Sequence, residues 1–289
     1  MMNLSVSTGV TALQNNIKLS ASEPKKVNFS GASDSFKLQD KKDLYLEKLN
    51  KLFPNNELTE IYNNINKDLG IDYPPQLKFY GDNDGVQAGG YVFSKNEVQM
   101  SLSDLLETDT KIVGIKNGKR VPLVSPKEHL PLFVSKQNAM MFVELQSKQG
   151  NLGFDELVIE PTTPEEQRKL VIQKLAHEVI HAQQHMIMRR TDGIGEKEIL
   201  KAWTHEKPKN MIEKAILDIK TNEMYKNSYW AGKETSIIFK KDTTQGYLAN
   251  IWLEAVRNYP PVTSPEYSRN PLETDAYLRA AQYVEKMKY

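Results

Sequence analysis

The chain has 289 residues, of which 39% are hydrophobic and 26% are charged, so it holds enough apolar material for a substantial core. Lysine and arginine number 38 against 37 aspartates and glutamates, and the formal net charge of +1 gives no general attraction to nucleic acid or to an anionic membrane. Cysteine is absent, which excludes structural disulfides, thiolate zinc sites and cysteine nucleophiles.

Residues 1–36 are rich in serine, asparagine, threonine, lysine and glycine, and this composition predicts a disordered leader. Within it, the short apolar patch Val27–Gly31 offers a place to dock on the domain or on a partner, but we favour plain disorder for this patch as well. We see no Sec-type signal peptide and no stretch long and apolar enough to span a bilayer. We therefore expect a cytoplasmic protein by default, with export by another route left open.

Residues 37–160 are expected to form two helices followed by strands. Apolar side chains at helical spacing predict one helix from Gln39 to Phe53 and a second over Leu58–Leu69. Strand patterns occur at Leu77–Tyr80, Gly89–Phe93, Glu97–Met100, Lys111–Val124 (a hairpin around Asn117-Gly118), Leu132–Val134 and Glu156–Ile159. We expect these strands to complete one small, twisted, mostly antiparallel sheet.

Residues 161–289 are expected to be almost wholly helical. Thr163-Pro164-Glu165-Glu166 has the pattern of a capping box with proline at the first helical position, and the helix that it opens runs to about Arg190. Further helical patterns cover Pro208–Met224, Tyr247–Val256 and Leu272–Met287. The sequence thus predicts an α+β fold in a single domain over 37–289, with a helix-and-sheet lobe at 37–160 and a helical lobe at 161–289.

The sequence His177-Glu178-Val179-Ile180-His181 lies within the helix predicted from Pro164. Residues four apart share one helix face, with Cβ atoms about 6 Å apart, so both histidines can bind one metal ion. Glu178 then lies within reach of a metal-bound water, whose proton it can take and later give to the leaving amine. His185 continues the row by one more turn, too far along a straight helix to join the same ion, and we interpret it as a core-edge or supporting residue.

A catalytic zinc site needs three protein ligands and one open position, so another residue must complete it. Glu273 is our first choice, because it lies at the start of the last long helix. The alternative is that Glu273 forms a capping box with Asn270, with no role at a metal. Asp275, Glu254 and Glu213 are the other downstream carboxylates that remain open as ligands.

Taken together, these motifs resemble the zincin metallopeptidases with a glutamate ligand, the gluzincins. More narrowly, Leu175–Gln184 together with Asn270–Tyr277 looks like compact bacterial zincins, in which an N-P-x-E-x-x-A stretch supplies the third ligand. The segment Ala88–Met100 is similar to the hairpin that precedes the active helix in such proteins. The resemblance implies a zincin-like fold, His177, His181 and Glu273 as ligands of one Zn²⁺ per chain, and Glu178 as the base.

The chain departs from the better-known gluzincin pattern on the second helix. That pattern has an Asn-Glu pair and a downstream aspartate, whereas Pro271-Leu272 precede Glu273 here and Asp275 is the nearest aspartate. The carboxylate that orients a histidine is therefore unassigned, and Asp275 is the group that we expect in that role. No Gly-x-x-His follows His181, so the metzincin pattern is absent.

Amide hydrolysis also needs a donor that stabilises negative charge on the carbonyl oxygen. Tyr277, one turn after Glu273, is our choice for this catalytic role, with Tyr267 and His205 as the other candidates. An extended peptide substrate would add to an edge strand, for which Tyr91–Phe93 and Glu97–Ser101 are both candidates.

The sequence therefore favours a zinc metallopeptidase, an endopeptidase rather than an exopeptidase, acting on peptide or protein substrates. The alternative is a binding or effector protein that keeps the zincin scaffold without proteolytic turnover, in which the leader recruits the partner. A third hypothesis is a helical interaction domain without metal, which requires both the histidine row and Glu273 to be incidental.

Overall fold

The computed structural model describes residues 33–81, 89–124, 133–233, 235–261, 264 and 266–287, with side chains from residue 41 onward. Of the predicted leader, residues 1–32, including the Val27–Gly31 patch, lie outside the described residues, and residues 33–36 begin helix α2 (Ser33–Leu52). No helix in the described ranges has the length and apolar character needed to cross a membrane.

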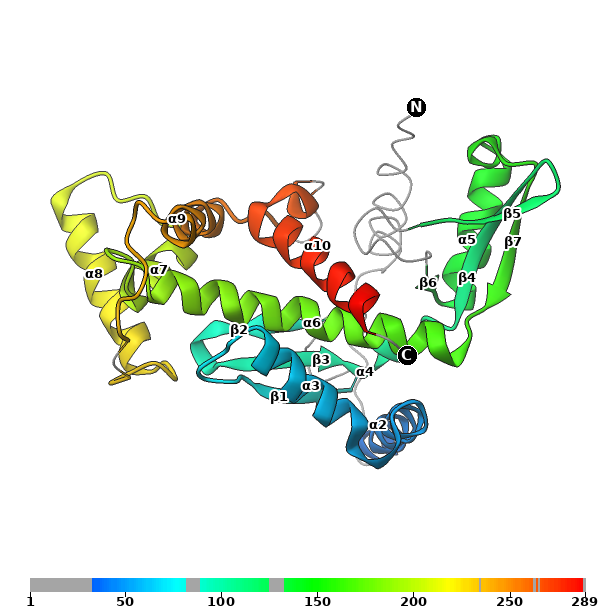
Figure 1. The fold of residues 1–289 in the computed structure, drawn as a ribbon, viewed down its shortest axis with the longest axis horizontal. Helices are drawn as coiled ribbons and strands as arrows, with labels where there is room; N and C mark the ends of the chain where they lie inside the picture. Colours follow the sequence, from blue (N-terminus) through cyan, green and yellow to red (C-terminus); the bar gives the residue numbers. More distant parts are fainter. Residues whose placement is uncertain are drawn as a thin grey trace.

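Helix α6 (Pro164–Arg189) runs lengthwise through the middle of the molecule, and the other elements are arranged around it (Figure 1). The predicted capping box is confirmed, because the Thr163 side chain accepts from the Glu166 backbone while the Glu166 carboxylate accepts from the Thr163 backbone. Its apolar residues, among them Ile172, Leu175 and Val179, are almost completely buried. From Leu170 onward the helix is therefore largely a core element, whereas its first turns expose charged residues such as Glu165.

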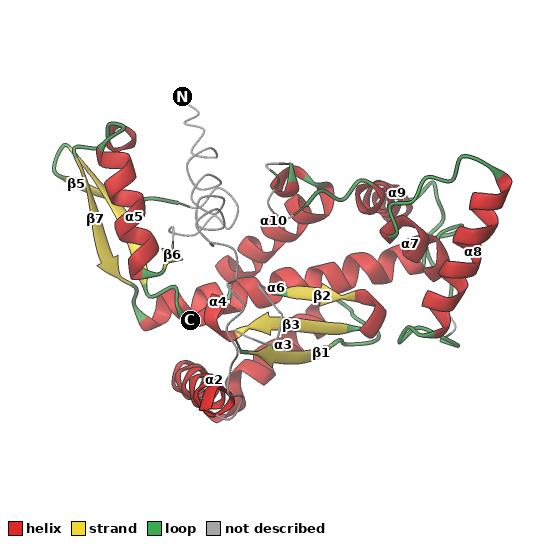
Figure 2. Ribbon diagram, turned by 180° about the vertical axis from the view of Figure 1, so that it is seen from behind, coloured by secondary structure: helices red, strands yellow, loops and turns green. Residues whose placement is uncertain are grey.

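A three-stranded sheet packs against one side of α6 (Figure 2). Its strand order is β1 (Gln76–Tyr80), β3 (Glu97–Ser101), β2 (Gly90–Val92), with β1 parallel and β2 antiparallel to β3. The short helix η2 (Phe93–Lys95) connects β2 to β3. Helix α2, η1 (Pro54–Asn56), α3 (Glu57–Asp68) and α4 (Leu102–Leu106) complete this part, and their apolar side chains share one core with α6 and α10.

The remaining strands form a second sheet, so the expectation of one sheet is wrong. Strand β4 (Thr110–Lys116) pairs with β5 (Lys119–Pro122), β6 (Phe133–Val134) and β7 (Glu156–Pro161), all antiparallel. Helix α5 (Lys136–Ser147) covers this sheet over a separate small core, and η3 (Asn151–Gly153) precedes β7. The predicted hairpin around Asn117-Gly118 is confirmed, and both turn residues have the positive φ that such a turn needs. Helix α4 separates β3, in the first sheet, from β4, in the second.

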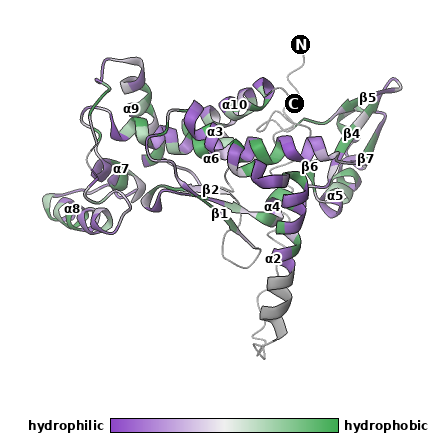
Figure 3. Cartoon of the chain, turned by 60° about the horizontal axis from the view of Figure 1, so that its bottom comes forward, coloured by the Kyte–Doolittle hydropathy of each residue, from purple (hydrophilic) through white to green (hydrophobic). Residues whose placement is uncertain are grey.

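After β7 the described chain is almost wholly helical, as predicted. Helices α7 (Glu196–Trp203), α8 (Met211–Lys226) and α9 (Thr244–Arg257) gather at the C-terminal end of α6, and η4 (Tyr267–Arg269) leads into α10 (Pro271–Lys286). Colouring by hydropathy shows apolar stretches of α6 between the elements that flank it (Figure 3). Helix α10 packs along α6, which brings the start of α10 beside the histidines of α6. The α+β class is confirmed.

Candidate metal centre

Two histidines of α6 and one glutamate of α10 meet in a buried cluster. The Nε2 atoms of His177 and His181 lie 3.0 Å apart. His177 Nε2 is 3.3 Å from one carboxylate oxygen of Glu273, and His181 Nε2 is 3.4 Å from the other. One donor atom from each residue falls within 4.8 Å of the others. The carboxylate of Glu273 is 1% exposed, so the cluster is cut off from bulk water on that side.

The start of α10 explains why Glu273 is free to face the histidines. The side chain of Asn270 caps this helix by accepting from the Leu272 backbone at 2.9 Å, and the Asn270 backbone N–H donates to the Tyr267 carbonyl at 3.1 Å. No reciprocal bond to the Glu273 carboxylate is therefore needed, and the alternative capping-box role for Glu273 does not describe the structure. Of the other carboxylates considered, Glu213 accepts from the Lys209 backbone N–H just before α8. Glu254 pairs with Arg257 on α9.

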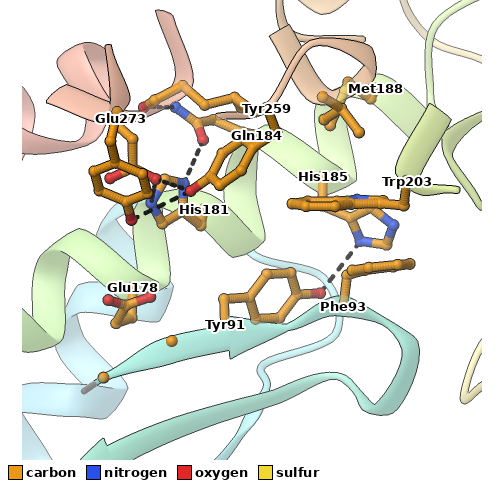
Figure 4. A pocket seen from close by; sticks show the side chains of 15 residues that line it. Tyr91, Phe93, Glu178, His181, Gln184, His185, Met188, Trp203, Tyr259 and Glu273 are labelled. Carbon is orange, nitrogen blue, oxygen red and sulfur yellow. Dashed lines mark hydrogen bonds and ion pairs between the residues drawn. The ribbon is translucent and has the colours of Figure 1, made fainter. Parts of the chain in front are cut away.

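Gln184, drawn beside His181 in Figure 4, holds this histidine in place together with Asp275. The Gln184 amide oxygen lies 2.8 Å from His181 Nδ1, and its amide nitrogen donates to Asp275 at 2.8 Å and to the Leu272 carbonyl at 3.1 Å. An amide oxygen can only accept, so it requires the proton on Nδ1 and leaves Nε2 of the neutral ring with a lone pair facing Glu273. Asp275 thus supports a histidine, as expected, but through Gln184.

The charges of this cluster shift one another's protonation. Burial raises the pKa of Glu178 above its usual range, and this outweighs the opposing effect of the two histidines. Burial alone would lower the pKa of His181, but the adjacent Glu273 carboxylate raises it to about 9. Burial would raise the pKa of Glu273, yet His181 and His177 hold it well below its usual range. Without a metal, the ionised Glu273 therefore relies on the histidines for compensation.

The Glu178 side chain lies between α6 and strand β2, beneath His181 in Figure 4. The backbone N–H of Tyr91 donates to its carboxylate. A Cβ atom on Gly89 would lie 3.5 Å from Glu178 Oε1 and 3.2 Å from the sulfur of Met100. A side chain at this position would therefore press on Met100 and lie in van der Waals contact with the carboxylate.

Strand β2 is the edge strand next to the site. Among the described strands it pairs with β3 alone, whereas β3 is paired on both sides. Of the two segments predicted to bind an extended substrate, Glu97–Ser101 is excluded, because its backbone groups are already used within the sheet. Gly89, Gly90 and Tyr91 line the pocket beside His181, so the Tyr91 strand is the unpaired edge next to the site, although the Tyr91 N–H is already used by Glu178.

The tyrosines near the site are placed differently from the sequence expectation. The Tyr277 ring packs against the His177 ring with centroids 4.2 Å apart, and the residue does not line the pocket. Its proposed part in stabilising negative charge stays a prediction. Tyr259 and Tyr267 do line the pocket, with their hydroxyls 3.2 Å apart, and the Tyr259 hydroxyl donates to Glu273. His205 lies elsewhere, with Nδ1 at 3.2 Å from the Arg257 carbonyl.

His185 is not part of the metal cluster, in agreement with the sequence interpretation. Its Nδ1 faces the Tyr91 hydroxyl at 3.2 Å, and its Nε2 faces the Glu196 carboxylate at 3.0 Å. Glu196 also approaches Arg189 at 3.0 Å, and the guanidinium of Arg189 stacks 3.8 Å from the Trp230 ring centroid. The result is a buried charged group that joins α6 to α7.

The pocket beside the cluster has a volume of about 140 Å³. It lies between α6, strand β2 and helices α7, α9 and α10, and Glu178, His181 and Glu273 all line it. Tyr259 and Gln184 are the contributors that sequence reasoning missed. Gln184 follows His181 by three residues and therefore lies on the same helix face, a spacing from which their contact could have been predicted. Tyr259 belongs to no recognisable sequence pattern.

Comparisons of this chain with models of protein families, with curated proteins and with solved structures find no match.

The donor set fits a zinc ion. Two imidazole nitrogens and one carboxylate converge, which is a common three-ligand set of catalytic zinc sites with an open fourth position. Glu273 Oε2 is buried and makes no hydrogen bond within the described part of the chain. A cation bound between the three residues would give this oxygen a partner. The Nδ1 atom of His177 likewise has no hydrogen-bond partner among the described residues.

Proposed function

We propose that this protein is a zinc-dependent peptidase that hydrolyses peptide bonds, an endopeptidase rather than an exopeptidase. The observation that carries the proposal is the convergence of His177, His181 and Glu273 beside a buried glutamate in an accessible pocket. These three residues would hold the zinc ion. When bound in such a site, zinc lowers the pKa of a water molecule towards neutrality and polarises a carbonyl group.

Glu178 is the proposed general base. A carboxylate whose pKa is raised by burial accepts a proton more readily than an exposed one, and it can return that proton to a leaving amine. The Tyr91 N–H holds the carboxylate from the strand side. Tyr259 donates its one hydroxyl proton to Glu273, so the Tyr267 hydroxyl is the pocket donor that we propose to support negative charge on a substrate oxygen, beside the predicted role of Tyr277.

The substrate is proposed to bind along β2. An extended peptide that adds to an open strand edge gains backbone hydrogen bonds irrespective of its side chains. Because β2 lies directly across the pocket from His181 and Glu178, a peptide on this edge would pass over the cluster. The geometry therefore suits an internal segment of a longer chain, which favours endopeptidase activity.

Zinc content together with cleavage of a broad peptide library tests this function. We expect one zinc per chain in protein purified without chelator, and a fall in kcat by about 10²- to 10⁴-fold in Glu178→Gln, because the base is lost while the ligands remain. His181→Ala should lose zinc and activity together. The matched control is Glu165→Gln on the exposed part of the same helix, which should keep both.

Two outcomes would contradict the proposal. If the purified protein binds no zinc, the cluster is not a metal site. If zinc binds but no peptide is cut, the alternative of a zincin-scaffold binding or effector protein replaces it.

A further inference from the structure

The pocket extends beyond the proposed zinc ligands along α6. Gln184, His185 and Met188 follow His181 at spacings that keep all four on one side of the helix, and all four line the pocket. The row leads away from Glu273 towards α7, where Figure 4 shows Met188 and His185 beside Trp203. We call this part the side pocket; it is lined by Phe93, His185, Met188, Trp203 and Val256.

Aromatic rings make up most of the walls of the side pocket. The Phe93 and Trp203 rings are nearly parallel, at 10°, with centroids 5.2 Å apart. The Tyr259 ring lies 5.2 Å from Trp203, and the His185 ring lies 5.7 Å from Phe93. Met188 adds a flexible thioether, which packs favourably against rings. Trp203, from a helix that no sequence pattern predicted, therefore joins the wall on the β2 side to the wall on the α9 side.

The polar atoms of the neighbouring side chains face groups within the protein, although His185 Nε2 makes no hydrogen bond among the described residues. Both ring nitrogens of His185 face other groups, the Tyr91 hydroxyl and the Glu196 carboxylate. Both ends of the Gln184 amide are used by His181, Asp275 and the Leu272 carbonyl. A charged side chain that entered the side pocket would lose water, and none of the five lining residues offers a carboxylate as counter-charge to a cation, which is unfavourable.

We infer that the side pocket binds an aromatic side chain of the peptide substrate next to the bond that is cut, and that Trp203 determines this specificity. The inference rests on the proposed peptidase function and adds the substrate class to it. An aromatic ring buries a large apolar area and also gains edge-to-face or offset contacts with the rings already present. Glycine gains neither of these, and lysine adds the cost of burying a charge.

Cleavage of matched peptides by the zinc-loaded full chain tests the specificity. The peptides share one frame and differ only in a central phenylalanine, leucine, lysine or glycine. We expect kcat/KM for the phenylalanine peptide to exceed that for glycine and lysine by at least about tenfold. Trp203→Ala should reduce this preference by about tenfold, and Trp203→Phe should restore part of it. Tyr247→Ala, an exposed aromatic residue of α9 outside the pocket, is the matched control.

A binding experiment separates failure of this inference from failure of the peptidase function. The phenylalanine and lysine peptides are titrated into zinc-loaded Glu178→Gln and into Glu178→Gln/Trp203→Ala. Tighter binding of the phenylalanine peptide that depends on Trp203 supports the side pocket even if the wild type cuts nothing. Cleavage without aromatic preference, or a preference that Trp203→Ala leaves unchanged, would overturn the inference and leave the peptidase function intact. Absence of both cleavage and binding would overturn both.

Discussion

At the scale of single residues, the orientation of His181 is the most specific feature of the cluster. A metal-binding histidine is held in one tautomer by the partner of its other ring nitrogen. Here that partner is the Gln184 oxygen, which is itself fixed by Asp275. Gln184 is completely buried, so water cannot replace it easily.

Replacing Gln184 should therefore weaken zinc binding. We expect Gln184→Leu to raise the Kd for zinc by about 10- to 100-fold, because the Nδ1 proton of His181 loses its acceptor and the ring loses its fixed orientation. Competition with a chromophoric chelator measures this change. Gln167→Leu on the same helix, whose amide bonds the Thr162 hydroxyl, is the control and should leave the Kd unchanged. An unchanged Kd in the Gln184 variant would show that the relay has no influence on the metal.

The site was only partly predictable at this scale. The spacing of His177, Glu178 and His181 is local, and a helix dictates where such residues point. Glu273 needed a resemblance to be chosen over Asp275, Glu254 and Glu213, because nothing local shows that α10 packs against α6. Tyr259 and Trp203 enter the pocket only through the packing of α7 and α9, and no sequence spacing records that packing.

At the scale of elements, Glu166 links the two sheet-bearing parts. It completes the capping box of α6 and pairs with Lys111 of β4 at 2.7 Å. Burial opposes its ionisation, but the hydrogen bond from Lys111 and the bonds at Thr163 lower its pKa below the ordinary value of 4.5. A lowered pKa means that the ionised form stabilises the fold above that ordinary value and that this stability is lost as the pH falls through the lowered pKa.

Glu166→Gln isolates this charge, since glutamine can still form a capping box. We expect the variant to lose about 0.5–1 kcal/mol of unfolding free energy at pH 7, and the difference from wild type to disappear at about pH 3. Urea denaturation at both pH values measures it. Glu165→Gln, which removes an exposed pair with Lys169, should show little effect at either pH. A difference that persists in acid would mean that the charge is not its source.

The buried group of His185, Arg189 and Glu196 joins α6 to α7 and so supports the wall that carries Trp203. Removing one member of a buried charged group leaves the others uncompensated. We expect Glu196→Ala to cost about 3–5 kcal/mol of unfolding free energy, measured by urea denaturation. Glu198→Ala, a neighbouring glutamate with an exposed side chain 3.5 Å from Lys201, should cost less than about 1 kcal/mol. Equal losses in the two variants would show that the buried group adds nothing beyond surface pairing.

Elements with strong end signals were the predictable ones. Thr163-Pro164 and Asn270-Pro271 mark the starts of α6 and α10, and both are observed within a residue of the expectation. Helix α7 was missed because it is short and Gly195 offers no side-chain cap. Helix α5 has a capping serine, Ser135, but its apolar residues do not follow helical spacing, because Met140 and Met141 lie on its exposed side. The division into two sheets depends on which strands pair, and pairing between distant segments leaves no local trace.

At the scale of the whole molecule, α10, which carries Glu273, and the β4–β7 sheet lie at separate places along α6 (Figure 1). The site joins α6 to α10 within the shared core, whereas the second sheet and α5 pack on their own small core of Ile112, Phe142 and Leu157. Ligand binding stabilises the elements that must be folded for the ligand to bind. Zinc should therefore affect these two parts unequally.

We expect zinc at 100 times its Kd to raise the unfolding free energy by about 2.7 kcal/mol and chelation to reverse the gain. Amide hydrogen exchange shows where this stability is located. Protection should rise in α6 around His177 and His181 and at the start of α10, and should stay unchanged in β4, β5 and α5. His181→Ala, which lacks a ligand, should show no change with zinc in any element. Uniform protection across both parts would mean that they unfold as one cooperative unit, and protection confined to the second sheet would place the metal elsewhere.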